Sequence, residues 1–121
     1  MSDALVVDDD PVTRLVLTHM LRSHGWRSYA AADVPEAAAM LREHTYDLVI
    51  CDFLLPSGTG TELLDVLGES APTRFVLLTG IIEYSAIPVR ASQRLSARLT
   101  KPVSSEALRE VLGRIFAEGP A

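Results

Sequence analysis

The chain has 121 residues, of which 48% are hydrophobic and 22% charged, and its formal net charge is −5. We expect one domain over residues 1–121, with 118–121 as a frayed tail. An acidic balance without a basic run argues against direct nucleic-acid binding, because phosphate recognition needs a basic footprint. No apolar stretch approaches the ~20 residues of a membrane span and no signal peptide is recognisable, so we expect a cytoplasmic protein without a membrane partner.

Short apolar runs alternate with segments of helical periodicity along the whole chain. The expected strands are residues 4–7, 27–31, 48–51, 75–78 and 97–100. Strand–helix alternation at this spacing implies right-handed crossovers, a parallel sheet and helices on both of its faces. The pattern therefore predicts an α/β fold, a doubly wound five-stranded parallel sheet.

The first two helices have clear start signals. Asp10 is suited to cap a helix that opens with Pro11. Asp33 and Glu36 have the spacing of a capping box before the second helix. We expect the apolar face of the first helix to point inward, and its residues are Val16, Leu17, Met20 and Leu21.

The third and last helices are also delimited by local signals. Thr59 and Glu62 form another capping-box spacing, and Gly68 ends the segment that follows. The last helix is expected to begin near Ser104.

The fourth helix falls within residues 82–95 and contains Pro88. Proline is tolerated at the first helical position but costs ~3 kcal/mol inside a helix. It also moves the preceding residue, Ile87, away from helical angles. We therefore expect a long loop over residues 80–87 and a short helix over about 88–95.

Polar side chains that can carry chemistry follow four of the expected strands. Asp8 and Asp9 follow the first strand, Asp52 the third, Thr79 the fourth and Lys101 the fifth. Ligands of doubly wound sheets bind at the carboxyl ends of the strands, near the point where the strand order reverses. These side chains are therefore expected to converge on one edge of the sheet.

Three carboxylates at one edge need compensation, because like charges in contact raise one another's pKa. Mg²⁺ suits the site, since it takes one or two carboxylates, keeps several waters and shares phosphate oxygens. Phosphoryl transfer to a carboxylate fits this arrangement, with Asp52 as the nucleophile and Asp8 and Asp9 holding the metal. Lys101 and Thr79 would neutralise phosphoryl oxygens.

Four short motifs resemble those of response-regulator receiver domains. They are LVVDDDP at residues 5–11, LVICDFLLP at 48–56 followed by Gly60, LLTG at 77–80 and TKP at 100–102. Each motif alone is weak, but all four occur in order, each after its own expected strand. The resemblance covers essentially the whole chain at the family's usual spacings.

The resemblance implies a flavodoxin-like sheet order of 2-1-3-4-5. We expect a phosphorylation-operated switch without its own output domain, either a stand-alone response regulator or a receiver excised from a hybrid kinase. The resemblance implies that Asp52 accepts phosphate from a histidine kinase or a histidine phosphotransfer protein, in a reaction that the domain catalyses only on itself. It also implies that Asp9 binds Mg²⁺ directly and that the backbone carbonyl of Leu54 completes the coordination. Thr79 would reorient toward the phosphoryl group and Lys101, before a cis Pro102, would pair with it. The sequence does not name the kinase, the signal or the downstream protein.

Four positions depart from the family pattern, and one of them is Pro88, which interrupts the helix that in the family belongs to the output face. Arg98 stands where many receivers have an aromatic residue that moves inward, so we do not expect that movement here. Leu54 and Ile81 flank the phosphoryl position without an amide or carboxylate to orient water, which predicts a long-lived phosphorylated state.

Two other functions are compatible with parts of this pattern. One is a protein-interaction module with the receiver fold that works without phosphorylation; its disadvantage is that the whole acidic set and the lysine are present. The other is a haloacid-dehalogenase-type phosphatase, an enzyme that also forms an aspartyl-phosphate. That chemistry places its nucleophile after the first strand, whereas Asp52 follows the third.

Overall fold

The computed structural model describes residues 2–68, 71–80, 87 and 89–116. Its centre is a five-stranded sheet in which every neighbouring pair of strands is parallel. The strand order is β2-β1-β3-β6-β7, which is 2-1-3-4-5 when these five strands are counted along the chain. The expected fold class is therefore confirmed. The strands are β1 (Asp3–Val7), β2 (Arg27–Ala31), β3 (Leu48–Asp52), β6 (Arg74–Thr79) and β7 (Ala97–Thr100).

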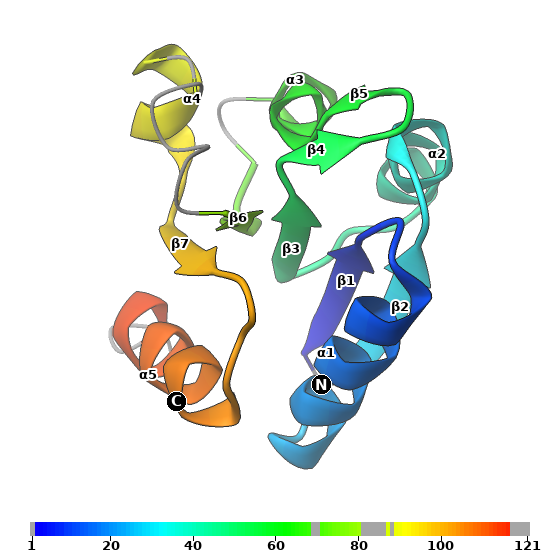
Figure 1. The fold of residues 1–121 in the computed structure, drawn as a ribbon. Coiled ribbons are helices and arrows are strands. Elements are labelled where there is room, and N and C mark those ends of the chain that lie inside the picture. The colour runs from blue at the N-terminus through cyan, green and yellow to red at the C-terminus, as the bar shows by residue number, and fades with distance from the viewer. Residues whose placement is uncertain (1, 69–70, 81–86, 88, 117–121) are drawn as a thin grey trace.

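Helices cover both faces of this sheet (Figure 1). One face carries α1 (Pro11–Ser23) and α5 (Ser105–Ile115). The other face carries α2 (Val34–Glu43), α3 (Leu63–Leu67) and α4 (Val89–Arg94). None of the helices in the described part of the chain is long and apolar enough to span a membrane.

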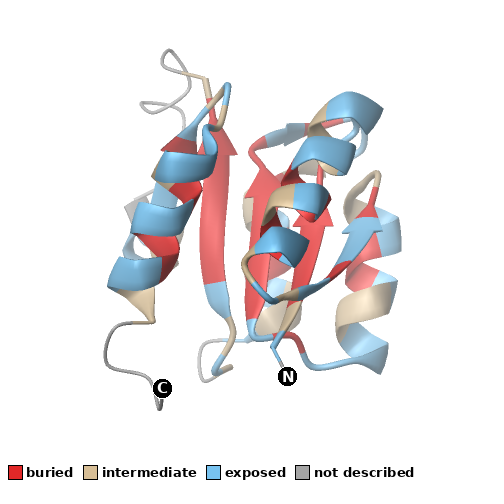
Figure 2. Ribbon diagram, turned by 90° about the horizontal axis from the view of Figure 1, so that it is seen from below, coloured by how far each residue is buried: buried red, intermediate tan, exposed pale blue. Residues whose placement is uncertain are grey.

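The hydrophobic core is divided by the sheet into two clusters. Leu5 and Phe75 belong to the cluster beneath α2 and α3, and Ile50 and Leu108 belong to the cluster beneath α1 and α5. Figure 2 shows the central strands as buried ribbons between helices whose outer sides are exposed. Because these strands are covered on both faces, they read as continuous apolar runs instead of alternating ones.

The helix starts follow the sequence signals. Asp10 caps α1 by accepting a hydrogen bond from Val12 N at 3.2 Å, and Asp33 accepts one from Val34 N at 2.9 Å. Ser104 caps α5 and accepts from Ala107 N at 3.0 Å.

The inward face expected for α1 is wrong at one position. Leu17 and Leu21 are buried, but the side chain of Val16 is 43% exposed. Val16 instead adjoins Val12 and Leu15, which are 66% and 69% exposed. The apolar stripe of α1 is thus wider than the core it covers, and part of it faces solvent.

The segment between β3 and α3 contains a small hairpin that the sequence did not predict. Strands β4 (Leu54–Leu55) and β5 (Gly58–Thr59) pair antiparallel. A 3₁₀ turn, η1 (Gly60–Glu62), then leads into α3. The expected capping pair is present, since Glu62 Oε2 accepts a hydrogen bond from Thr59 N at 2.8 Å.

The fourth helix is short, as the proline argument required. It has six residues, Val89–Arg94, inside the expected range 88–95. The loop expected over residues 80–87 and Pro88 itself lie largely outside the described residues.

Candidate functional site

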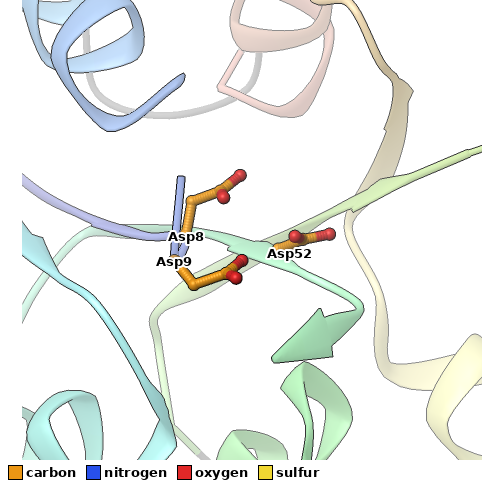
Figure 3. A group of neighbouring side chains, drawn as sticks. All are labelled: Asp8, Asp9 and Asp52. Carbon is orange, nitrogen blue, oxygen red and sulfur yellow. The ribbon is translucent and has the colours of Figure 1, made fainter. Parts of the chain in front are cut away.

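The three aspartates expected at the sheet edge come together. Asp8 and Asp9 follow β1, and Asp52 is the last residue of β3. Each offers an oxygen within 4.8 Å of those of the other two. Figure 3 shows their side chains gathered where β1 and β3 end. The cause is topological, because adjacent parallel strands deliver their carboxyl ends to the same edge.

Asp8 is the most constrained of the three. It is fully buried, and its Oδ1 accepts a hydrogen bond from Asp10 N at 2.9 Å. Its own N–H donates to Ala31 O at 3.1 Å. Asp52 is 7% exposed, whereas Asp9 faces solvent. A ligand entering the site therefore meets Asp9 and the edge of Asp52 first.

Lys101 lies between the two buried carboxylates. Its Nζ is 2.9 Å from Asp52 Oδ2 and 2.9 Å from Asp8 Oδ2. Burial of the ammonium lowers the pKa of Lys101, but the hydrogen bond to Asp52 and the contact with Asp8 outweigh burial and raise it overall. The peptide bond from Lys101 to Pro102 is cis, as the resemblance implied.

Thr79 ends β6 at the same edge and is fully buried. Its Oγ1 has no hydrogen-bond partner among the residues that the structure describes. Buried hydroxyls are rarely left unpaired, so an orphaned one in a native site calls for a functional reason. A phosphoryl oxygen would supply the missing partner.

The loop after Asp52 is held against the site by a close backbone approach. Gly60 N donates to Phe53 O at 2.7 Å. A Cβ at Gly60 would lie 2.2 Å from Asp52 O and 2.6 Å from Cys51 Sγ, which no side chain can tolerate. Leu54 begins β4 two residues after Asp52 and is 53% exposed; metal coordination by its carbonyl stays a prediction.

The donor set fits a hard divalent cation. Three carboxylates carry a formal charge of −3 and Lys101 carries +1, so the cluster is left at −2. All available donors are oxygens, the ligands that Mg²⁺ prefers. The residues present can therefore hold Mg²⁺.

Two contacts that support the site were not predicted from the sequence. Arg14, in the first turn of α1, donates from Nη1 to Asp8 O at 2.8 Å. Ser57, between β4 and β5, donates from N and Oγ to the carboxylate of Asp33. The pKa of Asp33 is lowered, first by the Ser57 hydroxyl. No local pattern announces either contact, because each joins elements whose relative position is set by packing.

Residues 4–113 match the model of the response regulator receiver domain. The chain belongs to this family. It is 28% identical over 120 residues to the protein PilH of Pseudomonas aeruginosa, with 97% of this chain and 99% of PilH covered. It is 34% identical over 113 residues to the response regulator protein PilR of the same organism, covering 90% of this chain and 25% of PilR. The chain thus spans a quarter of PilR.

Two solved structures extend the similarity. Chemotaxis response regulator CheY4 of Vibrio cholerae superposes with a TM-score of 0.83 at 27% identity, covering 95% of this chain and 98% of that one. Response regulator TrrA of Thermotoga maritima, solved in complex with Mg²⁺ and BeF, has a TM-score of 0.83 at 26% identity, with coverages of 95% and 99%.

Family membership makes the chain a receiver domain of a two-component system. Receiver domains are generally signalling switches, not enzymes, and typically have an acidic pocket for a divalent cation. They are phosphorylated by histidine kinases. One relative is itself a sensor kinase, RcsC of Salmonella typhi, 30% identical over 117 residues and covered over 12% of its length.

Proposed function

We propose that this receiver is a Mg²⁺-dependent phosphoacceptor and that Asp52 carries the phosphoryl group. The observation that carries the proposal is the buried Thr79 hydroxyl at the end of β6, which has no hydrogen-bond partner among the described residues, on the same sheet edge as Lys101 and the three carboxylates. A site that only binds a cation would account for the three carboxylates. It would not account for a buried hydroxyl without a partner and an ammonium beside the acceptor.

The transfer forms a P–O bond to an Asp52 oxygen as the P–N bond of a phosphohistidine donor breaks. The imidazole leaves and takes up a proton. Bound Mg²⁺ would neutralise charge on the transferring group, held by Asp8, Asp9, Asp52 and the Leu54 carbonyl. Lys101 would turn from Asp52 Oδ2 toward a phosphoryl oxygen, and Thr79 Oγ1 would donate to another. The domain would act on itself only, and the resulting state would be read by a downstream protein.

An exposed apolar surface beside the site suits the protein donor. It consists of Val12, Leu15 and Val16 on α1, and a groove of about 450 Å³ continues from it to Lys101 and Val103. A donor that brings phosphohistidine to Asp52 has to rest on neighbouring surface, and this one buries apolar area. We therefore propose a histidine kinase or histidine phosphotransfer protein as the partner that covers it.

Intact-mass measurement after incubation with acetyl phosphate and Mg²⁺ tests the function. The wild-type chain should gain one phosphoryl group, and Asp52→Asn should gain none because the nucleophile is lost. Asp9→Asn should be labelled only at raised Mg²⁺ concentration. Full labelling of the Asp52→Asn variant would show that another residue is the acceptor.

A further inference from the structure

The loop between β1 and α1 is held from several directions. Asp8 N–H donates to β2 through Ala31 O, and Asp10 N–H donates back to the Asp8 carboxylate. The Asp10 carboxylate in turn caps α1 through Val12 N at 3.2 Å and Thr13 Oγ1 at 2.7 Å. These contacts hold the Asp8 N–H, the Asp8 carboxylate and the start of α1, and none of them restrains the carbonyl of Asp8.

That carbonyl is held by Arg14. Its Nη1 donates a partly buried hydrogen bond to Asp8 O at 2.8 Å. The Arg14 backbone is fixed as well, because its N–H donates to Asp10 O at 3.0 Å as a first bond of α1. The arginine therefore joins the first turn of the helix to the peptide group between Asp8 and Asp9.

The orientation of this peptide decides where Asp9 points. Asp8 is locked by burial, but Asp9 is exposed, so the rotation of the peptide between them sets the place of its carboxylate. Mg²⁺ demands near-ideal octahedral geometry at about 2.0–2.1 Å. A small rotation is therefore enough to spoil one ligand.

We propose that Arg14 is a positioning residue of the metal site, acting by fixing the Asp8–Asp9 peptide. The inference rests on the proposed function, in which these carboxylates hold Mg²⁺. Arg14 should have two opposite effects on Mg²⁺ affinity. As a cation near the cluster, the guanidinium should weaken Mg²⁺ binding by repulsion, and as a positioning group it should strengthen it. Whether substitution of Arg14 raises or lowers the Mg²⁺ affinity therefore shows which effect dominates.

Two variants separate charge from geometry. Arg14→Lys keeps the charge but replaces the planar fork with a single flexible ammonium. Arg14→Met removes both the charge and the donor while keeping an unbranched stem. The matched control is Arg22→Met, which removes an arginine from the last turn of the same helix, where its Nη2 lies 3.4 Å from Ser28 O.

Mg²⁺ affinity of the full chain should be measured by calorimetry, together with amide NMR shifts of residues 8–10 and thermal melts without metal. Outer contacts to metal ligands are typically worth 10–100-fold in affinity. We expect Arg14→Lys and Arg14→Met each to weaken Mg²⁺ binding by about 10-fold and to shift the Asp9 amide in the metal-free form. Arg22→Met should bind Mg²⁺ like the wild type.

The possible outcomes are distinguishable. Tighter binding by Arg14→Met with wild-type binding by Arg14→Lys would reduce Arg14 to a repelling charge and overturn the inference. A lower melting temperature with unchanged Mg²⁺ affinity would make its role purely structural and overturn it too. Equal weakening by Arg22→Met would trace the effect to α1 as a whole. A wild-type chain that binds no Mg²⁺ would refute the proposed function itself.

Discussion

The two halves of the site are held in different ways. The acidic half, Asp8, Asp9 and Asp52, stands at the ends of β1 and β3, which have neighbouring strands on both sides. The responsive half comprises Thr79, at the end of β6, and Lys101, directly after the edge strand β7; the six-residue helix α4 lies between these two strands in the chain.

The difference lies in the contacts that would have to be exchanged. Backbone hydrogen bonds and burial fix Asp8, and the close approach of Gly60 fixes the backbone of Asp52. In the responsive half, α4 is tied down by side chains: Arg94 donates to Leu64 O at 2.6 Å, and Arg98 donates to Ser92 Oγ. Elements held by few exchangeable contacts are those that move at low cost. We therefore expect the acidic half to keep its position when a ligand binds and the responsive half to move.

The largest effect is expected at Gly60, where the acidic half has no spare room. In Gly60→Ala the new Cβ meets Asp52 O and Cys51 Sγ, so the backbone must shift. We expect a loss of about 3 kcal/mol in the free energy of unfolding, measured by urea denaturation. Gly113→Ala is the control, because its Cβ meets nothing within 4 Å in α5 and should stabilise by about 0.5–1 kcal/mol. Wild-type stability of Gly60→Ala would show that the acidic half is less rigid than its contacts indicate.

The lifetime of the phosphorylated state is expected to depend on residues next to both halves. Leu54 follows the acidic half and Ile81 the responsive half, and neither offers a group that orients water. Leu54→Asn combined with Ile81→Glu should accelerate phosphate loss by about 100-fold, because general acid–base help is restored. Intact mass followed over time after removal of acetyl phosphate measures the rate. Leu15→Asn, at a leucine of α1 that is 69% exposed, should leave it unchanged. No acceleration in the double variant would contradict the prediction.

Lys101 of the responsive half contacts two carboxylates of the acidic half, those of Asp8 and Asp52. Lys101→Met leaves the carboxylates of Asp8 and Asp52 uncompensated, so we expect the free energy of unfolding without metal to fall by about 2 kcal/mol. This loss is smaller than for a fully buried pair because the side chain of Lys101 is 30% exposed. Saturating Mg²⁺ should recover part of it. The raised pKa of Lys101 means that its contribution is complete below its unfolded pKa of about 10.4 and is lost as pH rises through the higher folded pKa. The difference between wild type and variant should therefore shrink only above about pH 10.4.

Denaturation with and without Mg²⁺, repeated across pH, measures this effect. Arg109→Met, which removes an exposed cation of α5, is the control and should change stability little. A difference that stays constant through the alkaline range would show that the ammonium does not stabilise the folded state by pairing.

The smallest effect is expected at Arg98, which stands outside the carboxylate cluster. Arg98→Gln and Ser92→Ala each weaken the contact between β7 and α4. We expect faster amide exchange in Val89–Arg94 and less than about a twofold change in beryllofluoride affinity, because no side chain has to move inward here. Exchange and NMR titration on the same samples test both parts. If Arg98→Gln abolished the beryllofluoride response of α4, residue 98 would be part of the switch after all.

The sequence by itself determined the five strands to within one residue at each end, and the polar residues near their carboxyl ends. Apolar runs of the buried strands and the capping residues Asp10, Asp33 and Ser104 are local signals, and the helices begin where these signals place them. The convergence of Asp8, Asp9 and Asp52 followed from parallel topology alone, because strand order decides which ends are neighbours. Pro88 likewise announced that α4 is short.

Only the tertiary structure decided how these parts are secured. Val16 reads as core by periodicity, yet α1 covers too little of the sheet to bury it. The rings of Trp26 and Phe116, which are far apart in the chain, pack with their centroids 5.3 Å apart and their planes tilted by 56°. The contact of Arg14 with Asp8 O depends on the exact seating of α1 on the sheet. Periodicity reports which side of an element is apolar, whereas side-chain partners far apart in the chain are chosen by how the elements pack.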